Sequence, residues 1–239
     1  MNIYTLFPLV AVIAYIPLLI TTISSRPWQR RHRLFILFLV AAMMWSLTSV
    51  FLRSNFFPQY NLLLLKAILI TYTWMAVQFY CFASSFFTPG QGRWLPLAYA
   101  TLAVIIPLIL LGYVAEGITA DGDRLYLDYG RGVVFLAIPL LILAVRMTYV
   151  FGKRLRILDN PVLRNQIFSL MLGLFILIIS TVAAFLPWGR EFPVNHFGGI
   201  IIAFIFSYAT IRHQLVDIRI VLRQGLAWVS LGIIGVKQF

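Results

Sequence analysis

Polar side chains lie on a single helical face within the apolar run 62–87. They are spaced three, four, three and four positions apart: Thr71, Trp74, Gln78, Cys81 and Ser85. In an α-helix this spacing places all five side chains on one side. Polar side chains are unfavourable against lipid, so this face indicates hydrogen bonds between helices or a small-molecule pocket within a bundle. We take these five as the candidate ligand-facing residues.

Residue types that perform catalysis or bind metals are few and dispersed. The three histidines, His32, His196 and His213, form no metal or hydrolase constellation, and no phosphate-binding or dinucleotide glycine motif is present. His196, at the outer mouth of the last apolar run, could ligate an ion or sense pH, but a solvated interfacial histidine is the plainer alternative. We expect no catalytic residue, metal ion or cofactor, and no enzymatic activity.

The composition is that of a membrane protein. Of the 239 residues, 62% are apolar and 11% are charged, whereas soluble chains are roughly 45–50% apolar and about 25% charged. Most of the apolar runs are long enough to cross about 30 Å of hydrocarbon as an α-helix. The seven runs are 3–23, 34–52, 62–87, 94–114, 132–150, 167–186 and 194–211. The sequence therefore predicts an all-α membrane protein, a seven-transmembrane helical bundle.

The basic residues indicate the orientation. With the N-terminus outside, the inner segments hold 14 of the 19 lysines and arginines, and the outer segments hold Arg53, Lys66, Arg124, Arg131 and Arg190. Basic residues favour the cytoplasmic side, so the C-terminus is predicted to be cytoplasmic. The net charge of +12 is explained by anionic head groups, which makes membrane lipids the expected partners and excludes nucleic acid. Arg146, near the end of its run, is expected to reach the inner head groups.

The longest loop, residues 115–131, is predicted to be a solvated turn on the outer side. Asp121-Gly122-Asp123 is typical of a turn. With Asp128 it loosely resembles a calcium loop, but the glutamate that ends such loops is missing. None of the seven acidic residues lies deep in a span, which disfavours a transporter or proton pump.

An apolar seam follows the last run. Ile211, Leu215, Ile218 and Leu222 are spaced four, three and four positions apart, close to the period of coiled coils. The last helix is therefore expected to continue straight into the cytoplasm or to bend along the inner surface. We divide the chain into a sensor-like domain (1–211), an amphipathic linker helix (212–225) and a short apolar segment (226–239) that could begin another membrane helix.

Two groups of residues carry a resemblance to a known family. Tyr208, Ala209, Arg212, Leu215, Asp217 and Ile218 form one pattern; Asn160-Pro161, Arg164, Gln166, Gly173 and Leu186-Pro187-Trp188 mark the sixth helix. On these residues the chain resembles the N-terminal seven-transmembrane region of bacterial histidine kinases. The resemblance implies a sensor in the bacterial plasma membrane whose last helix leads to a cytoplasmic output domain. The candidate signal-relay residues are then Tyr208, Arg212, Leu215, Asp217, Ile218 and Leu222.

The sequence departs from these relatives in its output domain. Residues 1–239 contain no phosphoacceptor-histidine helix and no ATP-binding glycine boxes. We therefore expect a truncated, split or degenerate receptor module that signals through a homodimer or through a separate cytoplasmic kinase or other output protein. Two alternatives stay open at this point: a non-catalytic accessory or structural subunit of a membrane complex, and, less favoured, a small transporter.

Overall fold

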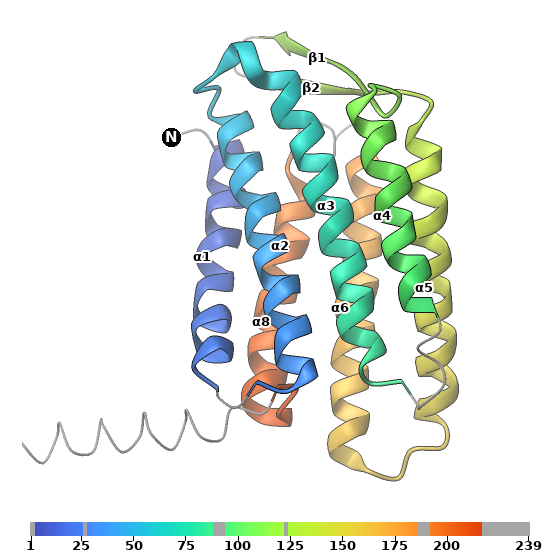
Figure 1. Cartoon of the computed structure of the whole chain (residues 1–239). Coiled ribbons are helices and arrows are strands. Elements are labelled where there is room, and N and C mark those ends of the chain that lie inside the picture. Colours follow the sequence, from blue (N-terminus) through green and yellow to red (C-terminus); the bar gives the residue numbers. More distant parts are fainter. Residues whose placement is uncertain (1–2, 26–27, 88–93, 122–123, 186–191, 217–239) are drawn as a thin grey trace, which may run out of the picture.

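The computed structural model describes residues 3–25, 28–87, 94–121, 124–185 and 192–216. Within these ranges the chain forms seven α-helices, a short 3-10 helix and one hairpin, with the long helices running alongside one another (Figure 1). The elements are α1 (Ile3–Ser24), α2 (Arg30–Arg53), η1 (Pro58–Tyr60), α3 (Asn61–Ser84), α4 (Leu95–Leu110), β1 (Ala115–Asp121), β2 (Arg124–Tyr129), α5 (Val133–Leu155), α6 (Pro161–Phe185) and α8 (Val194–His213).

Six of these helices are long and apolar enough to cross a membrane. The seventh, α4, has 16 residues, or about 24 Å at 1.5 Å per residue. It ends earlier than the predicted run 94–114, because the chain turns at Gly112, whose φ of 88° is open to glycine and unfavourable for other residues. The predicted helical bundle is thus confirmed for the described residues, with one helix shorter than expected.

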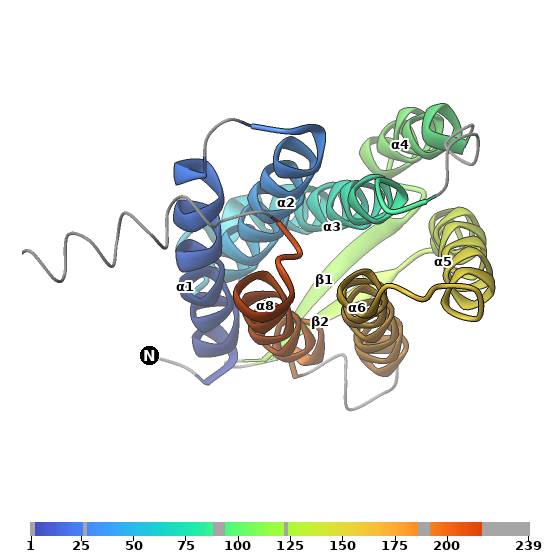
Figure 2. The ribbon, with the colours of Figure 1, turned by 90° about the horizontal axis from the view of Figure 1, so that it is seen from below.

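The helices form a ring in which most neighbours are consecutive in the chain. Helices α1, α2, α3 and α4 pack in sequence, and so do α5, α6 and α8. Contacts of α8 with α1, and of α5 with α3 and α4, close the ring (Figure 2). The first and last helices are therefore side by side, and α3 contacts helices from both halves.

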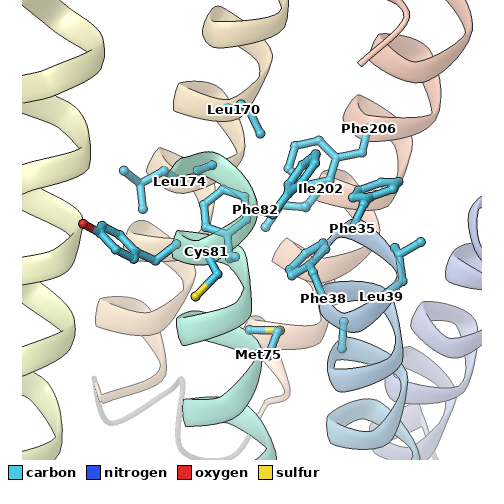
Figure 3. Close-up of a cluster of buried hydrophobic side chains, with 14 of the residues drawn as sticks. Phe35, Phe38, Leu39, Met75, Cys81, Phe82, Leu170, Leu174, Ile202 and Phe206 are labelled. Carbon is cyan, nitrogen blue, oxygen red and sulfur yellow. The ribbon is translucent and has the colours of Figure 1, made fainter. Parts of the chain in front are cut away.

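Aromatic rings fill the centre of the bundle between α2, α3 and α8. Phe35 of α2 and Phe82 of α3 have ring centroids 4.7 Å apart. Phe206 of α8 lies 6.1 Å from Phe35 and 5.9 Å from both Phe38 and Phe79. Figure 3 shows Phe206 beside Phe35 and Phe38. Edge-to-face and offset pairs of this kind add to the burial of large apolar surfaces, so α8 is held to the centre.

Small residues allow α6 and α8 to approach closely. A Cβ atom on Gly198 would contact the Ser180 hydroxyl and lie 2.7 Å from Ser180 Cβ. Across the same interface, a Cβ atom on Gly173 would lie 2.9 Å from Cζ of Phe206. Small residues at such contacts are the usual basis of helix association in membranes. On the other side of α8, the Tyr15 hydroxyl of α1 donates a hydrogen bond of 2.9 Å to the Gly199 carbonyl.

The loop 115–131 is more ordered than predicted. Strands β1 and β2 pair antiparallel, with Ala115 opposite Tyr129 and Ile118 opposite Leu127. The ladder is irregular between Ala115 and Gly117. This hairpin lies across one end of the bundle (Figure 1). The Asp-Gly pair that indicated a turn is also a strong hairpin signal when alternating apolar and polar residues flank it. The two strands could therefore have been predicted from the sequence.

Candidate functional site

The five residues predicted to face a ligand pack mainly within α3 and against α4. The Gln78 amide and the Tyr99 hydroxyl of α4 lie 3.4 Å apart. Thr71 and Ser85 donate hydrogen bonds to carbonyls of their own helix, at 2.8 Å to Ala67 and 2.7 Å to Phe82. Cys81 is fully buried, and Trp74 packs against the core. Among these hydrogen bonds only the one between Gln78 and Tyr99 joins two helices. Contact of this face with a ligand stays a prediction.

The Gln78–Tyr99 contact gives a testable expectation. Gln78→Leu and Tyr99→Phe should each lower the stability of the detergent-solubilised protein slightly. Because both substitutions remove the same contact, the double variant should lose less free energy of unfolding than the two single variants lose when added together. The coupling should be about 0.6 kcal/mol, the average for hydrogen bonds between membrane helices. Thermal unfolding of the four proteins measures it; additive losses would contradict a direct Gln78–Tyr99 interaction.

A cavity lies on another face of α3, between α3, α5 and α6. Its volume is about 360 Å³, and Trp45, Tyr129 and Asn195 contribute to its lining from other elements. The α3 wall includes Ile68, Tyr72, Ala76 and Tyr80, which are neighbours of the predicted residues rather than those residues themselves. Pockets of 300–1,000 Å³ with mainly apolar walls are typical of small-molecule sites. The described residues therefore contain a candidate site, but on a different face of α3.

Three polar residues of the cavity lining come from α3, α6 and α8: Tyr72, Thr181 and Asn195. The Tyr72 hydroxyl of α3 and the Thr181 hydroxyl of α6 are hydrogen-bonded to each other. Thr181 also donates to the Leu177 carbonyl, at 2.6 Å. Asn195, in the first turn of α8, lines the same region. Its buried side-chain oxygen has no hydrogen-bond partner.

His196 is buried, and the alternative of a solvated interfacial histidine is wrong. Only 4% of it is exposed, and its ring stacks on Trp45 with centroids 4.1 Å apart. Its Nδ1 lies 3.4 Å from the Ser46 hydroxyl. Since Trp45 lines the cavity, this stacking connects the cavity wall directly to the first turn of α8.

Arg146 also differs from its prediction. Helix α5 extends to Leu155, so Arg146 is not near its end. The guanidinium carbon lies 4.1 Å from the ring centroid of Trp94, which precedes α4. A cation–π contact therefore links Arg146 of α5 to the start of α4.

Helix α8 ends in a defined turn rather than continuing straight. Gln214 has φ 54° and ψ 45°, the left-handed conformation that commonly terminates helices. The backbone N–H groups of Gln214 and Leu215 both donate to the Ala209 carbonyl. Helix α8 continues through Arg212 and His213, but the straight amphipathic rod does not hold for residues 214–216. The division into domains stays a prediction.

A side chain of α6 fixes this turn. The Gln166 amide donates two hydrogen bonds of 2.8 Å, to the carbonyls of His213 and Gln214. Gln166 is buried, so both carbonyls gain a partner where little water reaches. In the sequence Gln166 stands out only as part of the family pattern. A glutamine beside an apolar run is the signal that could indicate a hydrogen-bond partner on another helix.

The predicted relay residues are divided by this turn. Tyr208 is exposed, and its ring lies edge-on to His213, with centroids 5.4 Å apart. Arg212 is exposed, whereas Leu215 is buried. Asp217, Ile218 and Leu222 lie outside the described residues, as does the segment 226–239. Among the relay residues the structure describes, Tyr208 and Arg212 are thus exposed and Leu215 is buried. Their role in a relay stays a prediction.

Comparison with known families identifies the type of bundle. The family model described as the N-terminal 7TM region of histidine kinase matches residues 7–219, which is most of the chain. The chain belongs to this family. No curated protein matches it.

As a histidine-kinase 7TM region, the chain is a multi-pass membrane protein of two-component signalling. The family is the sensory, non-catalytic part of histidine kinases, and six long apolar helices with a shorter one agree with it. The match includes both Gln166 and the Gln214 turn, so the junction between α6 and α8 lies within the region that defines the family.

Proposed function

We propose that this chain perceives an extracellular or membrane cue and relays it through α8 to a cytoplasmic output partner. In this proposal the protein sits in the bacterial inner membrane with its N-terminus outside. The partner is a separate histidine kinase, or a second copy of the chain that carries the signal to one. The single observation that supports it best is the end of α8, where Gln166 of α6 holds the Gln214 turn by two hydrogen bonds of 2.8 Å.

The position of α8 suits a relay element. It packs against α1 and α6, and its first turn contacts the cavity region through Asn195 and through His196 on Trp45. Its other end carries the exposed Tyr208 and Arg212. A small shift of such a helix changes both ends together, since a packed helix moves largely as a rigid element. The relay therefore involves Tyr208, Arg212 and Leu215, with Asp217, Ile218 and Leu222 beyond the turn.

Partner binding tests the proposal. The full chain and a chain lacking residues 212–239 are each tagged and expressed with a second copy and with the histidine kinase encoded nearest to the gene. We expect the deletion to lower co-purification of at least one of these partners by about tenfold, equivalent to about 1.4 kcal/mol of binding free energy. Full retention of both partners after the deletion, or no partner with the full chain, would overturn the proposal.

A point variant controls for damage by the deletion. Arg212→Glu reverses one exposed charge and leaves the buried turn at Gln214 in place. It should weaken the same interaction while the thermal unfolding of the chain stays unchanged. A reporter fused after Arg223 tests the orientation separately: activity on the external face would contradict the cytoplasmic C-terminus.

A further inference from the structure

The cavity between α3, α5 and α6 has walls that suit a hydrocarbon chain. Its described lining residues include none with a charged side chain. Along α3 they extend from Ile68 to Tyr80, about 18 Å at 1.5 Å per residue. An ionised group is costly in such surroundings unless it is paired. An occupant of this space is therefore uncharged and largely apolar.

Hydrogen bonding at Tyr72 and Asn195 in the cavity wall selects for a ligand that donates. The Thr181 hydroxyl has a single proton and donates it to the Leu177 carbonyl. In its hydrogen bond with Thr181, Tyr72 must therefore be the donor. The Tyr72 oxygen can then only accept from a ligand. The Asn195 side-chain oxygen is a second acceptor, buried and without a partner. Buried acceptors of this kind are usually satisfied, so the missing partner is a donor such as a hydroxyl or amide N–H.

The bilayer has access to the cavity through its side. Leu141 of α5 and Val182 of α6 both line the cavity. They are also 57% and 59% exposed, respectively. Both helices are long enough to span the membrane, so their exposed side chains face lipid. A molecule already dissolved in the bilayer can therefore enter between α5 and α6 without crossing water.

From these observations we infer that the cavity binds a single-chain lipid drawn from the bilayer, with an uncharged hydroxyl- or amide-bearing head group. The chain lies along Leu140, Ala144 and Met147, and the head group donates a proton to the unpartnered side-chain oxygen of Asn195. A head group with a second O–H or N–H proton can also donate to the Tyr72 oxygen. Its role as the perceived cue rests on the proposed function. The route from the site would be short, because Asn195 is in the first turn of α8 and Trp45 stacks on His196.

Photo-crosslinking in vesicles tests this inference. The full chain is reconstituted with a sixteen-carbon alcohol that carries a diazirine in mid-chain, and in parallel with its methyl ether, which cannot donate. Labelled residues are located by mass spectrometry. We expect the alcohol to label cavity residues of α5 and α6 about fivefold more than the ether, since one hydrogen bond contributes about 1 kcal/mol. Asn195→Leu should reduce that preference. Equal labelling of the cavity by both probes would overturn the inference.

A pair of matched alanine-to-phenylalanine variants tests whether the labelled lipid occupies the cavity. Ala144→Phe places a ring in the α5 wall, whereas Ala103→Phe makes the same change on an exposed position of α4 outside the cavity lining. Cavity labelling should fall about tenfold in the first variant and stay unchanged in the second. If Ala144→Phe unfolds the protein, Ala76→Phe fills the same space from α3. Undiminished cavity labelling in a folded filling variant would show that the lipid does not bind there.

The outcome is independent of the partner-binding test. Equal cavity labelling of the unaltered chain by the alcohol and the ether, with intact co-purification, would reject the lipid site and leave the proposed function standing. Cavity labelling without any partner would keep the lipid site and reject its role in signalling.

Discussion

A chain carrying Gly198→Leu is expected not to form the native bundle. A Cβ atom at this position already meets the Ser180 hydroxyl and lies 2.7 Å from Ser180 Cβ. The Cβ of Ser180 cannot rotate away, so α6 and α8 would have to separate. Overpacking by a methyl group typically costs about 1–3 kcal/mol, and leucine adds three further carbons. Size-exclusion chromatography and thermal unfolding in detergent should show aggregated protein or a greatly lowered melting temperature.

A control and a rescue identify the cause. Gly152→Leu makes the same change on α5, where a Cβ atom would have nothing within 4 Å. It should leave stability unchanged or raise it, because glycine inside a helix costs up to about 1 kcal/mol relative to other residues. Gly198→Ala should be moderately destabilised, and adding Ser180→Gly should restore at least half of the loss. A normal melting temperature for Gly198→Leu would show that α6 and α8 are not in contact there.

Replacing Gln166 by leucine is expected to release the turn at the end of α8. The substitution removes both hydrogen bonds of 2.8 Å to the carbonyls of His213 and Gln214. Buried polar groups that lose a partner cost about 1–3 kcal/mol. In the variant, the unfavourable left-handed conformation of Gln214 is no longer offset by these hydrogen bonds, since non-glycine residues are uncommon at positive φ. Backbone amides of residues 214 and 215 should then exchange hydrogen about tenfold faster, corresponding to about 1.4 kcal/mol.

Asn165→Leu is the matched control for this variant. Asn165 is the preceding residue on α6 and is exposed, so the same amide-to-leucine change should leave amide exchange at 214 and 215 unchanged. Mass spectrometry of the peptide that covers 209–216 compares the two variants with the unaltered chain. Equal exchange in Gln166→Leu and the unaltered chain would mean that α6 does not fix the turn.

The position of the turn also matters for the proposed relay. The exposed Tyr208 and Arg212 precede it on α8, whereas Leu215 and Val216 after it are buried. Seam spacing predicted that Ile211 and Leu215 share a helical face, and the turn prevents this. Helix α8 therefore ends in a bend at Gln214 that the Gln166 side chain of α6 holds in place.

Properties that depend on local composition could be predicted from the sequence. A helix satisfies its own backbone hydrogen bonds in hydrocarbon, so a long apolar run is by itself enough to indicate a membrane helix. The six long helices confirm this for six of the seven runs. Residues 160–188 and 208–218 likewise indicated the family, and the match over 7–219 confirms it. In both cases the signal lies in contiguous residues and needs no knowledge of neighbouring helices.

Which face of a helix meets which neighbour was decided by the tertiary structure. Thr71 and Tyr72 are adjacent in the chain but point about 100° apart around α3, so Tyr72 lines the cavity while Thr71 bonds to its own helix. Periodicity shows that residues share a face and leaves open what that face contacts. The cavity exists because side chains of α3, α5 and α6 leave space unfilled, and the Gln214 turn persists because Gln166 of α6 reaches it. Both depend on residues far apart in the chain, which only packing brings together.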